Sequence, residues 1–194
     1  MNTGPKGWNV VELSARVADR LGLDEHACRE VEAAVLFRDI GNITIPSEII
    51  DKPGPLTDGE WSVIQTHTIR GQGLLEKAPG ISREVGEIVR ASHERWDGLG
   101  YPDGLSGPSI PLAARIVSCC DALNAMTTAR PYRLAMSQEV ALRELVDNAG
   151  TQFDPHVVKT LISVIRRSVL TVSLPELVSP DGDRRLDRAG ARAA

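Results

Sequence analysis

A single stretch, 92–102, constrains the fold of this chain more than any other, because a helical pattern there runs directly into a glycine-rich loop. Apolar residues over 85–89 lie at helical spacing and lead into His93. Two glycines and a proline then follow, and they cannot continue the helix. Tyr101 adds an aromatic ring with a polar tip to the loop. The pattern fits the floor and wall of a ligand pocket, and it fits a simple helix-stopping turn equally well.

The composition is that of a globular protein without a strongly basic surface. The chain has 194 residues, of which 42% are hydrophobic and 25% charged, so it can form one domain with a sizeable core. Its net charge of -4 argues against binding to a nucleic acid polymer, which usually needs a basic face. A small anionic ligand held by a few arginines is compatible with this charge.

The cysteines and the hydropathy indicate a cytoplasmic protein that does not span a membrane. Cys119 and Cys120 are adjacent and Cys28 is remote, so the three form neither a disulfide framework nor a zinc motif. We expect all of them to be reduced core residues. No apolar run approaches the roughly 20 residues of a membrane span, and residues 1–7 lack the order of a signal peptide.

Helical periodicity recurs along most of the chain, and no segment shows convincing strand alternation or an internal repeat. Thr57 and Glu60 form a capping box at one helix start. After Pro175 the periodicity is lost, and the composition is typical of a disordered tail. The sequence therefore predicts an all-α fold. The expected helices span 10–21, 24–40, 57–75, 81–95, 110–126, 137–145 and 154–165, with a loop and a short helical turn over 41–54.

Two of these apolar segments contain charged side chains, which are costly to bury without a partner. Arg38 and Asp39 lie together inside the segment 24–40, and Asp121 lies among the apolar positions of 110–126. Either these residues form salt bridges within or between helices, or they belong to a functional site. The residues alone leave both interpretations open.

Two further features also allow a structural and a functional interpretation. His67 lies on a moderately apolar helix face, where a histidine is more often structural than a ligand. Arg130 and Arg133 surround a proline turn and form a small cationic patch that suits a phosphate group. A solvated turn would show the same pattern.

Four potential metal ligands emerge from this reading, and each lies on a different predicted helix. The core of a helical bundle is where such side chains can converge on a cation. Spacing alone does not show that they converge. The four residues are Asp39, His67, His93 and Asp121.

Several segments resemble, in the same order, the motifs of the HD-GYP domains, which are bacterial relatives of the HD metal-dependent phosphohydrolases. The resemblance covers most of residues 10–165. The matching segments are 36–46 for the HD motif region, 65–67 for the next histidine, 92–102 for the signature loop, Asp121 for the final metal aspartate, and 130–133 and 150–155 for two later signatures.

The resemblance implies an HD-superfamily helical bundle, with a single domain over 8–170 and a disordered tail over 171–194. Members of this family are typically cyclic di-GMP phosphodiesterases that hold two or three iron or manganese ions, and a metal-bound water or hydroxide attacks the phosphodiester. No residue is carried over as catalytic. The residues carried over are Asp39, His67, His93 and Asp121 as metal ligands, and Tyr101, Arg130 and Arg133 as substrate contacts.

The chain departs from the family pattern at four motif positions, and its first helix carries no ligand histidine. We therefore expect a degenerate site that holds one iron or manganese ion or none. The guanidinium of Arg38 is expected to pair with Asp39 or Asp121 in place of a lost cation. The replaced positions are Arg38 for the HD histidine, Asn42 for the motif lysine, Ser92 for the first of the paired histidines, and Asn124 for the second aspartate.

Three functions from different classes follow from this comparison. The first is a catalytically silent module of cyclic di-GMP signalling that binds a cyclic dinucleotide or a signalling protein. The second is an active cyclic di-GMP phosphodiesterase with a reduced metal site. The third is a structural module that forms a homodimer.

Overall fold

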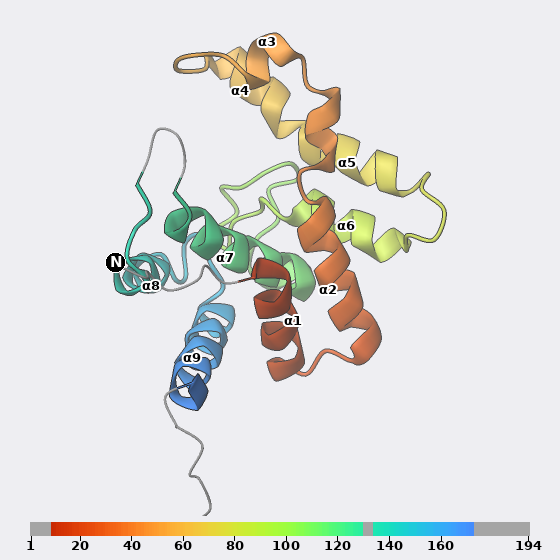
Figure 1. Cartoon of the computed structure of the whole chain (residues 1–194). Coiled ribbons are helices and arrows are strands. Elements are labelled where there is room, and N and C mark those ends of the chain that lie inside the picture. Colours follow the sequence, from red (N-terminus) through yellow and green to blue (C-terminus); the bar gives the residue numbers. More distant parts are fainter. Residues whose placement is uncertain (1–8, 130–133, 173–194) are drawn as a thin grey trace, which may run out of the picture.

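The computed structural model describes residues 9–129 and 134–172, with side chains described as far as Arg167, and helices are the regular elements of this part of the chain (Figure 1). The predicted all-α fold is confirmed. Residues 1–7, Arg130, Arg133 and residues 173–194 of the predicted tail lie outside the described residues, whereas residues 171 and 172 of that tail are the end of a helix. The α-helices are α1 (Val10–Arg20), α2 (Glu25–Phe37), α3 (Ser47–Ile50), α4 (Asp58–Gln65), α5 (His67–Leu75), α6 (Arg83–Ala91), α7 (Leu112–Thr127), α8 (Gln138–Asp147) and α9 (Pro155–Val172), and the 3-10 helices are η1 (Ile40–Thr44) and η2 (Gly107–Ser109).

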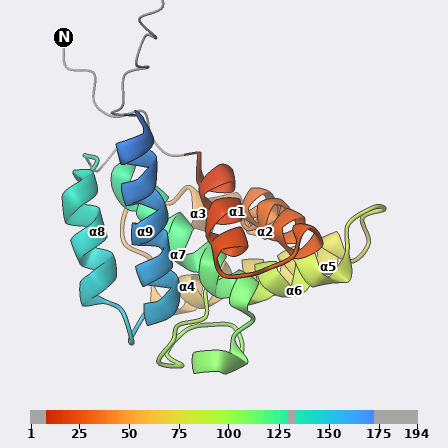
Figure 2. The same cartoon turned by 90° about the horizontal axis from the view of Figure 1, so that it is seen from below.

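Helix α7 lies at the centre of the bundle and packs against α1, α2, α6, α8 and α9 (Figure 2). Its residues Cys119 and Cys120 are fully buried, whereas Cys28 is half-buried, and all three thiols are free. Burial raises the pKa of the Cys120 thiol to about 12, so this thiol is protonated and unreactive at neutral pH. Among the described helices, none is both long and apolar enough to cross a bilayer.

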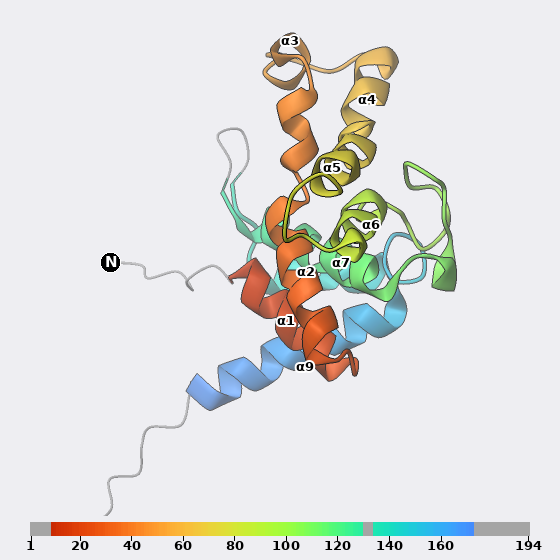
Figure 3. The same cartoon turned by 90° about the vertical axis from the view of Figure 1, so that its right-hand side faces the viewer.

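Helices α3 and α4 form a projecting arm, defined here as residues 46–66, that stands away from the bundle (Figures 1 and 3). The predicted capping box is confirmed, because Thr57 Oγ1 accepts from the Glu60 backbone and Glu60 reaches back to the Thr57 backbone. Glu60 also binds Lys52 Nζ at 2.7 Å. No residue of the arm is buried.

Two of the predicted helices end earlier than expected and a third is divided in two, and each of these positions has a side-chain hydrogen bond to the backbone. Helix α2 ends at Phe37, where the Arg38 side chain donates to the Val35 carbonyl at 2.6 Å. The predicted helix over 57–75 is two helices, and Thr66 at the break donates its hydroxyl to the Val63 carbonyl. Helix α6 ends at Ala91 instead of 95.

Helix α6 also ends at a hydrogen bond from a side chain to a backbone carbonyl. Ser92 Oγ donates to the Val89 carbonyl at 2.8 Å and competes with continuation of the helix. The expectation that each potential metal ligand lies on its own helix is therefore wrong. Only His67 and Asp121 are helical, whereas Asp39 and His93 lie in the turns that follow α2 and α6.

Candidate functional site

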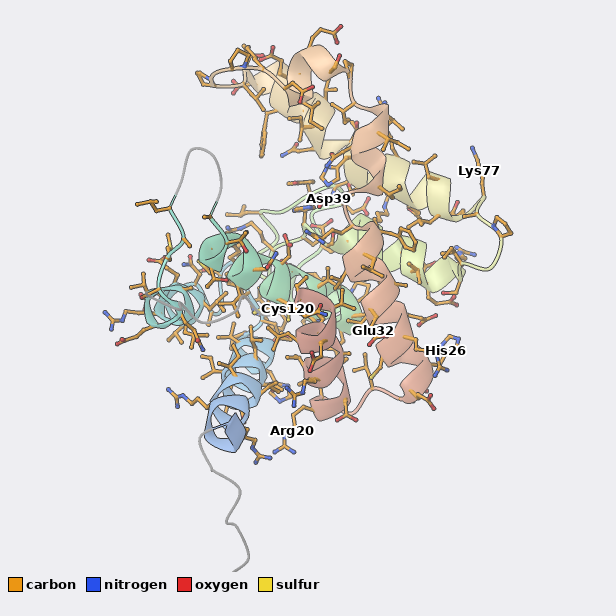
Figure 4. The ribbon with its side chains drawn as sticks, in the orientation of Figure 1. Arg20, His26, Glu32, Asp39, Lys77 and Cys120 are labelled. Atoms are coloured by element: carbon orange, nitrogen blue, oxygen red, sulfur yellow. The ribbon has the colours of Figure 1, made fainter. Side chains whose placement is uncertain are left out.

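Arg38 lies between two carboxylates that the sequence marked as metal ligands. Its Nε is 2.8 Å from Asp121 Oδ1 on α7, and its Nη2 is 3.4 Å from Asp39 Oδ2. Figure 4 shows Asp39 above α7, between the bundle and the projecting arm. The interhelical salt bridge that we considered for Arg38 is therefore present. It joins the end of α2 to the interior of α7, and the Arg38 and Asp121 side chains are 23% and 28% exposed.

His67, His93 and Tyr101 form an aromatic cluster next to this ion pair. His67 is the first residue of α5 and is 4% exposed, and its ring lies edge-on to His93 with centroids 5.0 Å apart. Tyr101 stacks on His93 with a centroid distance of 5.1 Å and an interplanar angle of 7°. The sequence-predicted residues are thus brought together as two groups, one ionic and one aromatic.

The hydrogen bond at one His67 nitrogen indicates the tautomer of the ring. Nδ1 lies 2.7 Å from the Ile64 carbonyl, which can only accept, so Nδ1 carries the proton. In the neutral ring with this tautomer, Nε2 presents a lone pair. Within the described residues this buried atom has no hydrogen-bond partner.

Burial sets the charge states of the other two rings. It lowers the pKa of His93 to about 4, with the proximity of His67 adding to the effect and Asp39 opposing it, so His93 is neutral at pH 7. Burial also raises the pKa of Tyr101 to about 12, and the Asp39 carboxylate acts in the same direction. Tyr101 is therefore a protonated hydrogen-bond donor at neutral pH.

The signature loop, 92–102, is held in place by hydrogen bonds to the segments next to it. Glu94, which is 3% exposed, accepts from the Asp103 backbone at 2.7 Å. The Asp97 amide donates to the Thr151 carbonyl at 2.8 Å, which ties this loop to the connection between α8 and α9. Gly100 is required by close approach, because a Cβ there would lie 2.3 Å from the Arg95 nitrogen. The loop is therefore a built support for Tyr101 and more than a helix stop.

The buried support also contains residues that the sequence analysis missed. Arg115 on α7 binds Asp154 at 2.6 Å, with side-chain exposures of 17% and 5%, and its guanidinium lies 5.7 Å from the centre of the Trp96 ring. The sequence did contain a feature that could have indicated this pair, since Asp154 belongs to the segment 150–155 that matches a later family signature. Arg115, like Asp121, is a charged residue within the apolar segment 110–126. A charged side chain in such a segment needs a partner of opposite charge, so Arg115 could have been singled out for the same reason.

The described donors do not fit the centre of two or three metal ions that the resemblance implies. Across residues 9–129 and 134–167, no three His, Cys, Asp or Glu side chains are grouped so as to hold a metal ion. Arg38 contributes to this misfit, because its permanently charged guanidinium forms ion pairs with both Asp39 and Asp121. Asn42, at the motif lysine position, lies at the 3.5 Å limit of a hydrogen bond to Asp39.

The comparison with known families assigns the chain. A model of the HD domain matches residues 3–157. This chain belongs to the HD domain family. The cyclic di-GMP phosphodiesterase response regulator RpfG of Xanthomonas campestris is 42% identical to it over 151 residues, which cover 77% of this chain and 40% of RpfG. A cyclic di-GMP phosphodiesterase of Thermotoga maritima is 37% identical over 159 residues, which cover 81% of this chain and 42% of the relative.

Other relatives named for a different cyclic dinucleotide are also similar. The 3'3'-cGAMP-specific phosphodiesterase 2 of Vibrio cholerae is 33% identical over 161 residues, covering 82% of this chain and 31% of the relative. The chain thus spans less than half the length of these curated relatives.

Solved structures support the fold. A cyclic GMP-AMP-specific phosphodiesterase of Vibrio cholerae superposes with a TM-score of 0.64 at 18% identity, covering 87% of this chain and 46% of the other. Bd1817, an HDGYP-type protein of Bdellovibrio bacteriovorus, gives a TM-score of 0.63 at 19% identity, covering 82% and 51%. The resemblance to HD-GYP domains is confirmed at the level of family and fold.

Proposed function

We propose that this chain is a cyclic-dinucleotide-binding module of HD-GYP type in which Arg38 takes the place of a metal ion. The observation that carries the proposal is the position of the Arg38 guanidinium, 2.8 Å from Asp121 and 3.4 Å from Asp39. The relatives that act on cyclic di-GMP supply the class of ligand.

The chemistry of Arg38 favours binding over hydrolysis. In metal-dependent hydrolysis a bound cation lowers the pKa of a water and generates the nucleophile. A guanidinium supplies positive charge and hydrogen bonds, but it has no vacant site for a water and does not lose its proton in proteins. The exchange therefore preserves charge balance around the carboxylates and removes the source of the nucleophile.

Tyr101 is the described residue best placed to contact a nucleotide. One face of its ring is covered by His93, and its hydroxyl is held in the protonated, donating form. Aromatic rings bind nucleobases by stacking, which contributes about 1–3 kcal/mol per base. Arg130 and Arg133 are proposed as the phosphate contacts from the sequence pattern alone, because they lie outside the described residues.

Binding and turnover measured on the same sample test this proposal. We expect calorimetry to show binding of cyclic di-GMP, no turnover after anaerobic reconstitution with iron(II) or manganese(II), and at most one bound ion per chain. Tyr101→Ala should weaken binding about tenfold, whereas Val140→Ala, at an exposed position of α8, should leave it unchanged. Two bound ions together with turnover, or no binding of any cyclic dinucleotide, would contradict the proposal.

A second candidate is a phosphodiesterase with a reduced, single-ion site, and one observation favours it. His67 Nε2 is buried without a partner in the described structure, and the adjacent His93 is neutral, so the His93 ring offers a lone pair. In this case His93→Ala would abolish both turnover and the binding of the single ion. Turnover that is unchanged in this variant would exclude the second candidate.

A further inference from the structure

The arm, residues 46–66, exposes large apolar side chains that nothing covers in the described structure. Its exposed apolar side chains include Ile50, 42% exposed, and Trp61, 49% exposed. Every residue of the arm is described, and none is buried. Large exposed aromatic residues at the surface of a short helix are characteristic of protein interfaces.

The arm lacks the packing that usually stabilises short helices. Its helices α3 and α4 have four and eight residues, whereas isolated helices shorter than about 12–15 residues are marginal in water. Its polar interactions include the capping box and the ion pair of Lys52 with Glu60. Burial of Trp61 against another surface would supply the missing hydrophobic stabilisation.

The charge of the arm restricts its partner. The arm carries four carboxylates and one lysine, which give it a net charge of -3. Glu48, Asp51 and Asp58 are exposed, while Glu60 is paired with Lys52. Two arms would repel each other, so a direct arm-to-arm contact between copies is unfavourable. A surface that is apolar and basic is complementary to the arm.

This chain itself carries such a surface, at the groove between α8 and α9. These two helices lie side by side in Figure 2 and are connected by a short loop. The groove has a volume of about 540 Å³, and its apolar lining includes Val146, Val158 and Ile162. Lys159 and Arg166 add positive charge, and no acidic side chain is among the described lining residues.

We propose that copies of this chain associate by docking the arm of one copy into the α8–α9 groove of another. The arm and the groove lie at opposite ends of the molecule, as Figure 3 shows for the arm and α9, so the contact is made between molecules. Trp61 and Ile50 are the apolar anchors, and the acidic residues of the arm face Lys159 and Arg166.

The contact is heterologous, because two different surfaces meet, and this makes it testable by complementation. A variant with a damaged arm still has an intact groove, and a variant with a damaged groove still has an intact arm. A mixture of the two retains one complete contact per pair. An isologous contact, in which one surface meets the same surface of the other copy, does not predict this pattern.

The experiment is analytical ultracentrifugation of the wild type, Trp61→Asp, Ile162→Asp and an equimolar mixture of the two variants. We expect the wild type to form species larger than a monomer, each variant alone to associate at least tenfold more weakly, and the mixture to form a 1:1 complex. Ile69→Asp is the matched control, since Ile69 is similarly exposed, at 43%, but lies outside both surfaces. A monomeric wild type, or a mixture that stays monomeric, would overturn the proposal.

Ile162 is half-buried, so Ile162→Asp could perturb folding. Charge-reversal variants at exposed positions then provide a second test of the docking. Asp58→Lys on the arm and Lys159→Glu in the groove are both surface changes, and each should weaken association of its own chain. Combining the two changes in one chain restores complementary charges and should recover association. Failure of the double variant to recover association, with circular dichroism unchanged, would also count against the docking. These measurements involve no ligand and are independent of the proposed function.

Discussion

At the level of single residues, the side chain at position 38 has the largest effect on the electrostatics of the site. Imidazole is a neutral ligand that can bind a cation, whereas guanidinium is itself the cation. In the structure, Asp39 and Asp121 are both ion-pair partners of the Arg38 guanidinium. The family resemblance suggested this pairing from the sequence, because a fixed charge at that position requires a counter-charge.

The burial of His93 makes stability depend on pH. The pKa of His93 is about 4 in the folded protein, below the ordinary value near 6.5, because burial disfavours the charged ring. Between these values the unfolded chain binds a proton and the folded protein does not. The free energy of unfolding should therefore fall as the pH drops from about 6.5 to about 4, by on the order of 3 kcal/mol.

Urea unfolding at several pH values checks this expectation. His93→Gln should reduce the slope of stability against pH in this window, whatever its effect on stability at neutral pH. His156→Gln, at an exposed position near the start of α9, serves as the control and should retain the slope. An identical slope in wild type and His93→Gln would show that other groups govern the acid sensitivity.

At the level of elements, the site depends on how closely η1 approaches α5. Gly41 in η1 lies against the start of α5, and a Cβ at this position would be 1.9 Å from the His67 carbonyl oxygen and 2.8 Å from the Gly71 nitrogen. The backbone of Asp39 and that of His67 are brought together by this contact. Only glycine allows the two elements to approach so closely.

Gly41→Ala should therefore destabilise the fold, by about 1–3 kcal/mol or more, because backbone atoms cannot move aside cheaply. Gly73→Ala is a matched control, since Gly73 lies inside α5 with no atom near the added Cβ. It should stabilise the protein by about 0.5–1 kcal/mol through helix propensity. Denaturant titration measures both, and effects of equal size and sign would refute the close approach.

The elements themselves were largely predictable from local chemistry. Helix starts at Asn9, Asp24, Thr57, Ser82 and Ser137 follow capping rules, although Asn9 and Ser82 were not predicted as caps. Helix ends were predicted less well. Apolar periodicity continues past Phe37 and Ala91, and only the side-chain bonds of Arg38 and Ser92 reveal where the helices end.

At the scale of the whole molecule, one buried ion pair links α7 to the end of the loop before α9. Arg115 and Asp154 form this pair beneath the signature loop, with side-chain exposures of 17% and 5%. Breaking a buried pair leaves a charge without compensation. Arg115→Met should therefore reduce the free energy of unfolding by about 3–5 kcal/mol.

An exposed pair provides the comparison. Arg143 and Glu139 on α8 have side-chain exposures of 69% and 86%, so Arg143→Met should change stability by less than about 0.5 kcal/mol. Thermal and denaturant unfolding of both variants measure the contrast. A small effect of Arg115→Met would mean that Asp154 finds another partner or becomes protonated.

The sequence by itself determined the all-α class, the family and the identity of the residues that could form a site, because these depend on local periodicity and on motifs in order. The tertiary structure decided how those residues are grouped. It placed Arg38 between Asp39 and Asp121, stacked His93 on Tyr101, and left the arm uncovered. Contacts between residues far apart in the chain arise from packing, which no local pattern encodes.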